Sequence, residues 1–408
     1  MKRLTAVHSL PFATPAGRLV DRAGWNSETG IYLHLPFDYS PNIPEHPTSD
    51  QLRSAVAQLI SPFRAYQWAT LDDAAAAVCS VLTAVARPVL DLCPAVLFDG
   101  SSQGCGKTRA ATALGSLITG RRESVLPFFH DDDEMRKQII SGVLTAQPFY
   151  CLDNVVGHFK SPTLAAVLTA GRLQGRVLGA SRTVDASIRA LFTMTSNNCS
   201  LDADLMRRTM RVRIDSGADP TLRRFDFCPV SEALRDRLKI AESACVIWRA
   251  YLAAEAPRIA NDDAGGFTNW SNLCRQPVLW LAREGLADGL GDPAASMLAD
   301  AAGSDPELEA HADLLRALNA LAPDGAVFSS KELLTWWKAG EHADDGPFAS
   351  LREAVSECLN LRAGQVPTGR SLGRMLHFRR DRVVHKLQLL AKGDRSTNAQ
   401  LWRVVHVG

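Results

Sequence analysis

The feature that most constrains the fold is a glycine-rich segment between an apolar run and a helical run. Residues 95–98 are continuously apolar, which predicts a buried strand, and residues 108–118 have the spacing of a helix. Between them the chain reads Phe98-Asp-Gly-Ser-Ser-Gln-Gly-Cys-Gly-Lys-Thr108. Small residues such as Gly104 and Gly106 allow successive backbone N–H groups to turn inward, and the start of a helix adds a partial positive charge. The segment therefore predicts a loop that binds a phosphate-bearing anion.

The residue types at the end of this loop suit a nucleoside triphosphate with magnesium. We expect Lys107 to reach the β and γ phosphates and Thr108 to ligate Mg²⁺. The strict pattern has a glycine where this chain has Ser101, and Gly100 comes one place early. Because serine is small and the strand-loop-helix order is intact, we interpret the loop as a variant; the alternative is a chance glycine-rich turn. The predicted nucleotide-binding residues are Ser102, Gln103, Gly104, Cys105, Gly106, Lys107, Thr108 and Arg109.

Two later apolar runs end in side chains that complement the loop. Residues 149–152 lead into Asp153, a strand-terminal carboxylate that we expect to hold Mg²⁺. Residues 191–195 lead into Ser196-Asn197-Asn198, where the amide of Asn197 would orient the attacking water or sense the γ phosphate. The alternative for the second run is an ordinary Asn turn.

The sequence leaves the general base open. The residue after a magnesium-binding aspartate of this kind is usually Glu, and here it is Asn154, which we keep among the candidate catalytic residues. Glu134, in the acidic run 131–134, is the candidate base, and the alternative is that this run only caps a helix.

An arginine pair follows the third apolar run. Arg207 or Arg208 is a candidate finger that would neutralise phosphate charge in a neighbouring subunit, because guanidinium has a fixed charge and a planar fork. One of the two is better explained as a partner in a local ion pair.

The order of elements predicts an α/β fold. Apolar runs at 95–98, 125–129, 149–152 and 191–195 alternate with helical stretches at 108–118, 134–145 and 163–170, and a buried helix at 71–89 precedes them. This alternation is typical of a parallel sheet with helices on its faces.

The remaining segments give the domain organisation. We predict an irregular or small β-containing region at 1–65, a nucleotide-binding core at 66–218, a helical lid or connector at 219–322 and a C-terminal module at 323–408. In the last of these, Ser329 and Glu332 form a capping box for a helix, two further helices are expected near 348–359 and 371–378, and apolar runs follow at 383–390 and 401–407. Three helices followed by a two-stranded wing predict a winged helix-turn-helix.

Composition and charge limit the function classes. The chain has 408 residues, of which 46% are hydrophobic and 22% charged, as in globular proteins, and no uncharged stretch reaches the roughly 20 residues of a membrane span. We therefore expect a cytoplasmic protein without membrane contact, with its nine scattered cysteines as reduced thiols. Net charge is only +1, but residues 362–403 contain ten Arg or Lys and two Asp, a local excess of +8 that predicts a polyanion-binding surface.

A series of motifs in a fixed order resembles a known family. The motifs are LTAVARP (82–88), the phosphate loop, DEMRK (133–137), LDNV (152–155), RVLG (176–179), TSNN (195–198) and DLMRR (204–208), with weaker likeness at DPAAS (292–296), RRDRVV (379–384) and LWRV (401–404). Together they resemble the ATPase part of primase-helicases encoded by prophages and other mobile elements, which are related to superfamily 3 and MCM-like AAA+ helicases. The resemblance covers about two thirds of the chain.

This resemblance implies an AAA+ domain, with ATP and Mg²⁺ as cofactors, in a ring-shaped homo-oligomer, a hexamer, that unwinds DNA during replication of the element. Other replication proteins are expected as partners. The primase part of longer relatives has no counterpart before residue 66, so priming is not implied.

The resemblance also implies DNA contacts. A hairpin at 175–185 would project into the ring's pore, with Arg176 and Arg182 on DNA phosphates; the alternative is a solvated surface hairpin. In the C-terminal module the predicted DNA contacts are Arg374, Arg379, Arg380, Arg382 and Arg395; the alternative is a solvated charged face or a protein-docking module. Three tryptophans of this module are expected in the core: Trp336, Trp337 and Trp402.

Three hypotheses about function remain. The first is a DNA helicase or translocase of a mobile element. The second is an AAA+ initiator or helicase loader that binds ATP and DNA without unwinding, which Asn154 in place of Glu favours. The third, a DNA-binding regulator or defence protein with a vestigial nucleotide site, is disfavoured because the site residues are all present: Lys107, Thr108, Asp153, Asn197 and the pair Arg207 and Arg208.

Overall fold

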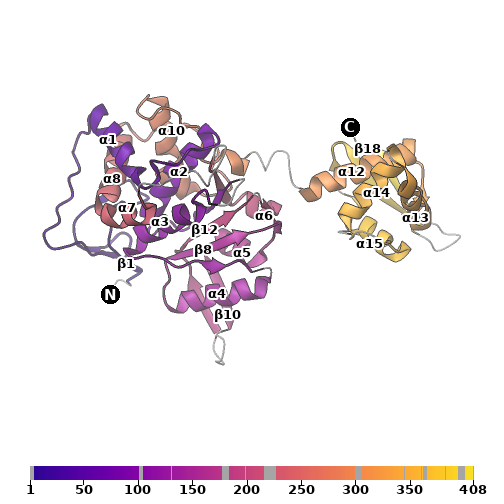
Figure 1. Ribbon diagram of the computed structural model, residues 1–408, viewed down its shortest axis with the longest axis horizontal. Coiled ribbons are helices and arrows are strands. Elements are labelled where there is room, and N and C mark those ends of the chain that lie inside the picture. The colour runs from indigo at the N-terminus through magenta and orange to yellow at the C-terminus, as the bar shows by residue number, and fades with distance from the viewer. Residues whose placement is uncertain are drawn as a thin grey trace. The chain divides into compact units, whose positions relative to one another are not determined.

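The computed structural model describes residues 4–100, 104–129, 131–176, 183–197, 199–215, 227–298, 306–343, 345–359, 361, 365–381, 383–393 and 400–407. The chain divides into two compact units, Met1–Ala302 and Gly303–Gly408, which we describe separately (Figure 1). No helix in the described ranges combines the length and the apolar character needed to span a lipid bilayer.

The N-terminal unit is built around a five-stranded parallel sheet. Its strands are β6 (Ala95–Asp99), β7 (Leu126–Pro127), β8 (Phe149–Val155), β12 (Leu191–Ser196) and β14 (Thr209–Arg213). The order across the sheet is β14-β6-β12-β8-β7, and every neighbouring pair is parallel. The expected mixed α/β architecture with a parallel sheet is therefore present. We did not anticipate β14, which forms the edge next to β6.

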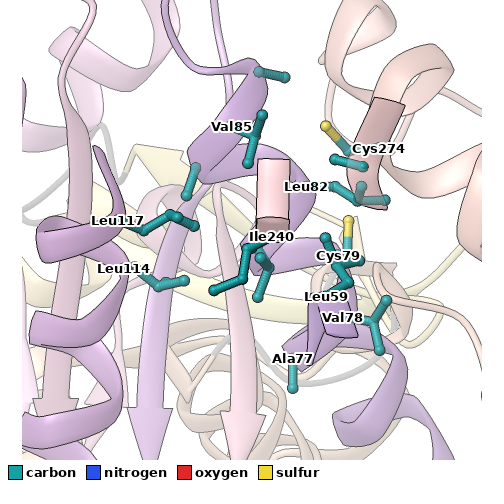
Figure 2. Close-up of a cluster of buried hydrophobic side chains, with 14 of the residues drawn as sticks. Leu59, Ala77, Val78, Cys79, Leu82, Val85, Leu114, Leu117, Ile240 and Cys274 are labelled. Atoms are coloured by element: carbon teal, nitrogen blue, oxygen red, sulfur yellow. The ribbon is translucent and has the colours of Figure 1, made fainter. Parts of the chain in front are cut away.

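Each face of the sheet is covered by helices, so alternate residues of one strand enter different cores. Val96 and Phe98 of β6 pack in one cluster, with α2 (Leu71–Ala86), α3 (Lys107–Thr119) and α8 (Arg237–Ala253). Ala95 and Leu97 pack in the other, with α4 (Asp132–Leu144), α5 (Pro162–Ala170) and α6 (Ala203–Met206). Figure 2 shows the first cluster, in which α2, α3 and α8 meet through side chains such as Leu82, Leu114 and Ile240.

The N-terminal region contains a helix that we did not expect. Its strands are β1 (Ala6–His8), β2 (Phe12–Ala13), β3 (Leu19–Val20), β4 (Gly24–Asn26) and β5 (Ile31–Leu33), which form a three-stranded and a two-stranded sheet. Helix α1 (Ser49–Leu59) follows, and then a 3-10 turn, η1 (Ser61–Phe63). Thr48 and Gln51 form a capping box at the start of α1, and Leu52, Val56 and Leu59 are buried on one face. The description of residues 1–65 as irregular or β was therefore incomplete.

The helical segment that we predicted as one connector is divided between the units. Its first helices are α7 (Pro229–Arg235), α8, α9 (Thr268–Trp270), the π-helical turn η3 (Ser271–Arg275) and α10 (Gln276–Arg283). They pack in the N-terminal unit, where Ile240 and Trp248 join the same cluster as α2. Helix α12 (Pro306–Leu321) belongs to the C-terminal unit because Leu314, Leu315 and Leu318 are buried in that unit's core. The predicted division at residue 322 thus differs from the structure, and the divisions at 65 and 218 stay predictions.

A hairpin extends from the N-terminal unit between α5 and β12. Strands β10 (Arg172–Arg176) and β11 (Thr183–Ser187) pair antiparallel, with Arg176 opposite Thr183. The hairpin expected from the sequence is therefore present (Figure 1). Arg176 belongs to its last described residue pair. Short strands β9 (His158–Phe159) and β13 (Ser200–Leu201) form a separate two-stranded parallel sheet.

In the described part of the C-terminal unit, α12 is followed by three further α-helices and a β-hairpin. Its elements after α12 are η4 (Pro323–Gly325), β15 (Phe328–Ser329), α13 (Ser330–Ala339), η5 (Gly340–His342), α14 (Pro347–Cys358), α15 (Gly369–Arg379), β16 (Val383–Val384), β17 (Leu387–Gly393) and β18 (Gln400–His406). The predicted Ser329–Glu332 capping box is present, and Trp337 and Trp402 are buried while Trp336 packs against the core. This order agrees with the one we expected, and the identity of the unit as a winged helix-turn-helix stays a prediction.

One predicted strand is broken. We expected a continuous run at 383–390, but His385 and Lys386 have φ values of 47° and 62°, and β16 pairs antiparallel with β17 across them. Two successive residues with positive φ form the two-residue turn that joins hairpin strands. The first two residues of the run therefore fold back on the rest.

Candidate functional site

The described part of the glycine-rich loop has the backbone that the sequence predicts. The φ angles of Gly104 and Gly106 are 82° and 93°, in the left-handed region that favours glycine. Gly106 caps the N-terminus of α3, and a Cβ there would lie 2.8 Å from the hydroxyl oxygen of Tyr66. Ser102 and Gln103 lie outside the described residues. Arg109 is exposed in the first turn of α3.

Lys107 points toward the end of β12. Its Nζ donates a hydrogen bond of 2.6 Å to Oδ1 of Asn197 and lies 3.5 Å from the carbonyl of Gly100 and 3.3 Å from Sγ of Cys105. The lysine is 8% exposed. Two residues that are 90 positions apart in the chain, and that we predicted independently, therefore meet.

Thr108 and Asp153 also meet. The Thr108 hydroxyl donates to Oδ1 of Asp153 at 2.7 Å, although 45 positions separate them. The hydroxyl of Thr195 donates to the same oxygen at 2.7 Å. Hydroxyl and carboxylate oxygens are the hard ligands that Mg²⁺ prefers, and Mg²⁺ commonly keeps several waters, so that two protein ligands suffice. Thr108 and Asp153 thus fit the predicted magnesium site.

A β-bulge sets the position of Asp153. Strand β8 has one residue more than β12 at this point. Two residues of β8, Asp153 and Asn154, lie opposite the single residue Thr195 of β12, between the pairs Met194–Leu152 and Ser196–Val155. Asn154 has a φ of 59°, and its N–H donates to the Thr195 hydroxyl at 2.9 Å. Bulges re-aim side chains and are common beside active sites. The bulge therefore turns the strand at the carboxylate, and Asn154 is exposed directly after it.

Strand order explains why these side chains converge. Strand β12 lies between β6 and β8, so the residues that end β12 stand between the glycine-rich loop and Asp153. The carboxyl ends of parallel strands share one edge of a sheet, where open α/β sheets bind ligands. Three successive residues at the end of β12 and just after it each contact a different part of the site. Thr195 contacts Asp153, Ser196 contacts Asp99, and Asn197, which follows the strand, contacts Lys107.

Asp99 and Ser196 were not among the predicted site residues. Asp99 ends β6, is 2% exposed, and accepts a 2.5 Å hydrogen bond from the Ser196 hydroxyl and a 2.9 Å bond from the N–H of Gly100. Arg211 of β14 lies 4.0 Å from its other oxygen. The carboxylate thus fixes the first residue of the loop to the end of β12. A buried strand ending in Asp before the loop was the available signal.

An aromatic cluster beside the loop was also missed. The Tyr66 hydroxyl donates to the carbonyl of Gly106 at 2.9 Å, and its ring stacks on Trp68, with centroids 5.6 Å apart and planes 10° apart. Phe63 contacts both rings edge-on. The spacing of aromatics in residues 63–68 was visible, but nothing in the sequence placed them at the loop.

The arginine pair makes local contacts. Arg207 donates to Oδ1 of Asp204 at 2.7 Å, and Arg208 donates to the hydroxyl of Thr169 at 2.7 Å and to the Asp204 carbonyl at 2.6 Å. The hydrogen bond from Arg207, with the charge of Arg208, holds the pKa of Asp204 below its usual value. Within this chain both arginines have the local partners that we named as the alternative, and their role toward a neighbouring subunit stays a prediction.

Glu134 lies in the first turn of α4 and pairs with Lys137 at 2.5 Å. Asp131 caps this helix, and Asp132 binds Ser161 and Thr163 at the start of α5. Among the described residues, no hydrogen bond or ion pair joins Glu134 to Asp153, Lys107 or Asn197. The cap that we named as the alternative is present, and the part of Glu134 as a base stays a prediction.

The predicted DNA-binding residues that the structure describes differ in their exposure to solvent. Arg176 is exposed on the hairpin, and Arg374 is exposed on α15. Arg380 is exposed and lies 3.4 Å from a carboxylate oxygen of Asp381. Arg379 is partly buried and contacts the carbonyl of Cys358 at 3.4 Å, so it is the least free of the group. Arg182, Arg382 and Arg395 lie outside the described residues.

Comparison with known proteins adds little to this geometry. No family model and no curated protein matches the chain. Two solved structures of the apo A form of the NrS-1 C-terminal region are similar, with TM-scores of 0.39 and 0.33. Each is 12% identical in sequence to this chain, and each alignment covers 97% of this chain and 84% of the solved chain. Likenesses this low carry no argument, so the proposals below rest on the residues themselves.

Proposed function

We propose that the N-terminal unit binds and hydrolyses ATP with Mg²⁺. The observation that carries the proposal is the convergence of two pairs, Lys107 with Asn197 and Thr108 with Asp153, at the carboxyl edge of the sheet. A lysine and a hydroxyl at the start of a helix, facing a strand-terminal carboxylate, are the groups that phosphate transfer with magnesium requires. In this proposal the protein is an AAA+ ATPase.

The residues divide the work by their chemistry. The N–H groups of the loop and the start of α3 hold the phosphates, and Lys107 neutralises charge that develops on the γ phosphate. Thr108 and Asp153 would hold Mg²⁺, which would offset the negative charge of the phosphates. Asn197 already contacts Lys107, so its amide is placed to orient water at the γ phosphate. Glu134 or Asn154 would complete the site as base or water-positioning group.

At the level of the whole protein, we propose an ATP-dependent DNA helicase or translocase of a mobile genetic element that acts as a hexameric ring. The ordered motifs, from LTAVARP to DLMRR, support this assignment. The basic C-terminal segment and the exposed Arg176 supply groups for DNA phosphates, and Arg207 or Arg208 would act across subunits. In the C-terminal unit, α15 would be the recognition helix and the β17–β18 hairpin the wing of a winged helix-turn-helix.

One observation favours a second function. Asn154 stands where a helicase of this kind usually has its catalytic Glu, and Glu134, the other candidate base, pairs with Lys137. An initiator or helicase loader, which responds to ATP binding and hydrolyses it slowly, would tolerate this replacement.

The two functions separate in one experiment. ATP turnover would be measured with and without single-stranded and forked DNA, alongside strand separation and particle mass with a non-hydrolysable ATP analogue. We expect DNA-stimulated turnover and unwinding, and we expect Lys107→Ala to remove both, by at least about a hundredfold in kcat.

Lys239→Ala is the matched control, because it removes an exposed lysine whose ion pair is with Asp236 and not with the loop. Assembly with the analogue, slow turnover and no unwinding would select the loader. Failure to bind any nucleoside triphosphate would exclude both functions.

A further inference from the structure

A cavity of about 960 Å³ opens at the opposite edge of the sheet from the nucleotide site. Pro148 and Arg189, which line it, directly precede β8 and lie just before β12, so the cavity lies at the amino ends of these strands. Its other walls come from the segment around β1, the end of α3, the turn after α4 and the base of the β10–β11 hairpin. None of the predicted nucleotide-binding residues lines it.

The charged side chains on the cavity wall are mostly cationic. Arg121, Arg172 and Arg189 line it, against the single carboxylate of Asp185, which leaves two positive charges in excess among the lining residues. Burial, with the nearby Arg237, lowers the pKa of His8 to about 3, so this lining histidine is neutral at pH 7. Arg121 pairs with Glu123 and Arg172 with Asp185.

Arg189 differs from these two because it lacks a carboxylate partner. Its Nη1 donates to the carbonyl of Pro88 at 2.6 Å, and no ion pair involves it within the described ranges. Burial, and then the charge of Arg87, lowers the pKa of Arg189.

Arg87 has the same kind of environment and lies directly behind this wall. It is 4% exposed, and its guanidinium donates to the carbonyls of Ala190, Leu90 and Ile188. Asp91 attracts Arg189 at longer range, while its own carboxylate binds the N–H of Leu92 and the amide of Asn269. Two partly desolvated cations side by side are costly unless an anion offsets them. The cavity wall is therefore suited to receive one.

The hairpin continues this cationic surface outward. Arg172, Gln174 and Arg176 alternate along β10 and are all exposed, so they share one face. Arg172 lies at the cavity, and Arg176 lies at the far end of the strand. A phosphate chain that contacts Arg176 would reach the cavity along this face.

We infer that the cavity is a second anion site that takes phosphate esters of a single-stranded nucleic acid, held by Arg189 and Arg121 and continuous with the hairpin. This inference rests on the proposed nucleic-acid binding and is independent of ATP hydrolysis. A free nucleotide offers the same phosphate chemistry, and the test distinguishes the two sources.

Fluorescence anisotropy of a labelled oligothymidylate over a salt series tests the inference, with wild-type protein and the variants Arg189→Gln and Arg121→Gln. We expect each variant to bind roughly tenfold more weakly, because a charge-assisted bond to phosphate is lost. The slope of log K against log salt should become shallower by about 0.7 per lost contact. Arg53→Gln is the control, since Arg53 is an exposed residue of α1 paired with Asp50; its affinity should not change.

A second arm uses inorganic pyrophosphate and AMP with Lys107→Ala protein, in which the nucleotide loop is disabled. The measured quantity is the rise in thermal unfolding temperature that these ligands cause. If Arg189→Gln removes this rise and leaves oligothymidylate affinity unaffected, the cavity binds a free phosphate compound. Arg121 is largely exposed, so Arg121→Gln decides the matter if thermal unfolding shows that Arg189→Gln is misfolded. Variants that match the Arg53→Gln control in both arms overturn the inference. If wild-type protein binds no oligonucleotide, the proposed DNA function fails, and the pyrophosphate arm alone decides the anion site.

Discussion

The hydroxyl of Thr195 organises the metal-binding side of the site. It donates to the carboxylate of Asp153 and accepts from the N–H of Asn154, so one group satisfies both halves of the bulge. Residues that orient a metal ligand control its position and basicity without touching the metal. Thr195 is therefore a positioning residue.

Removing this hydroxyl should lower activity without unfolding the protein. We expect Thr195→Val to weaken the apparent Mg²⁺ affinity or kcat by roughly 10- to 100-fold, as loss of such a partner typically does, and Thr195→Ser to restore most of it. Magnesium titrations of ATP turnover measure both quantities. Thr193→Val is the control, because Thr193 lies on the same strand and its hydroxyl donates to the carbonyl of Tyr150 and not to Asp153. Equal losses in the two valine variants would mean that the effect is general to the strand.

Tyr66 should contribute to nucleotide affinity through the backbone of the loop. Tyr66→Phe keeps the ring that stacks on Trp68 and removes the donor to the Gly106 carbonyl, a bond worth about 1 kcal/mol. We expect ATP to bind several-fold more weakly, as measured by calorimetry, with kcat nearly unchanged. Tyr39→Phe removes a hydroxyl bonded to Glu242 instead and should leave ATP affinity as it is. If Tyr66→Phe leaves ATP affinity unaltered, the Tyr66 hydroxyl does not contribute to nucleotide binding.

At the scale of elements, the bulge in β8 gives a conformational reason for asparagine at 154. A positive φ costs most residues about 1 kcal/mol or more, while Asn tolerates it through local hydrogen bonding. The φ of 59° therefore favours Asn over Glu independently of chemistry. The replacement that made us consider a loader has a structural explanation as well.

Substitutions at Asn154 distinguish the effect of the backbone conformation on stability from the effect of the side-chain amide on catalysis. We expect Asn154→Gly to leave the unfolding free energy nearly unchanged and Asn154→Ala to lower it by about 1 kcal/mol, as measured by urea denaturation. ATP turnover of the glycine variant then tests the proposed catalytic part of the amide. Turnover equal to that of wild type would contradict that part and leave Asn154 with a conformational role only.

Strands differed in how well the sequence predicted them. The central strands β6, β8 and β12 are covered on both faces and read as continuous apolar runs, which identified them. The edge strand β14 alternates, with Met210 and Val212 buried and Arg211 and Arg213 more exposed, and such a short arginine-rich segment is a weak strand signal. The two-residue turn at His385 and Lys386 was missed because neither residue type signals a positive φ.

At the scale of the whole molecule, each unit has its own hydrophobic core. The N-terminal unit buries residues on both faces of its sheet, and the C-terminal unit buries a separate set that includes Leu372 and Trp402. A compact unit with its own core can unfold by itself. The two units therefore need not share one unfolding transition.

Calorimetry should resolve two transitions that respond to different changes. We expect Leu372→Ala to lower only the C-terminal transition and Leu82→Ala only the N-terminal one, each by about 2–5 kcal/mol, since both side chains are fully buried. A non-hydrolysable ATP analogue with Mg²⁺ should raise only the N-terminal transition, by linkage of binding to the folded state. A single transition that both substitutions lower equally would contradict this independence.

The sequence by itself determined the parallel α/β core, the glycine-rich loop and the side chains that end its strands. Periodicity, glycine spacing and strand-terminal polar residues are local signals, and Lys107, Thr108, Asp153 and Asn197 follow from them. Only the tertiary structure decided which strands are neighbours, and hence that β12 stands between the loop and Asp153. The parts played by Thr195, Ser196, Asp99 and Tyr66 depend on contacts between residues 40 to 97 positions apart, for which no local pattern exists.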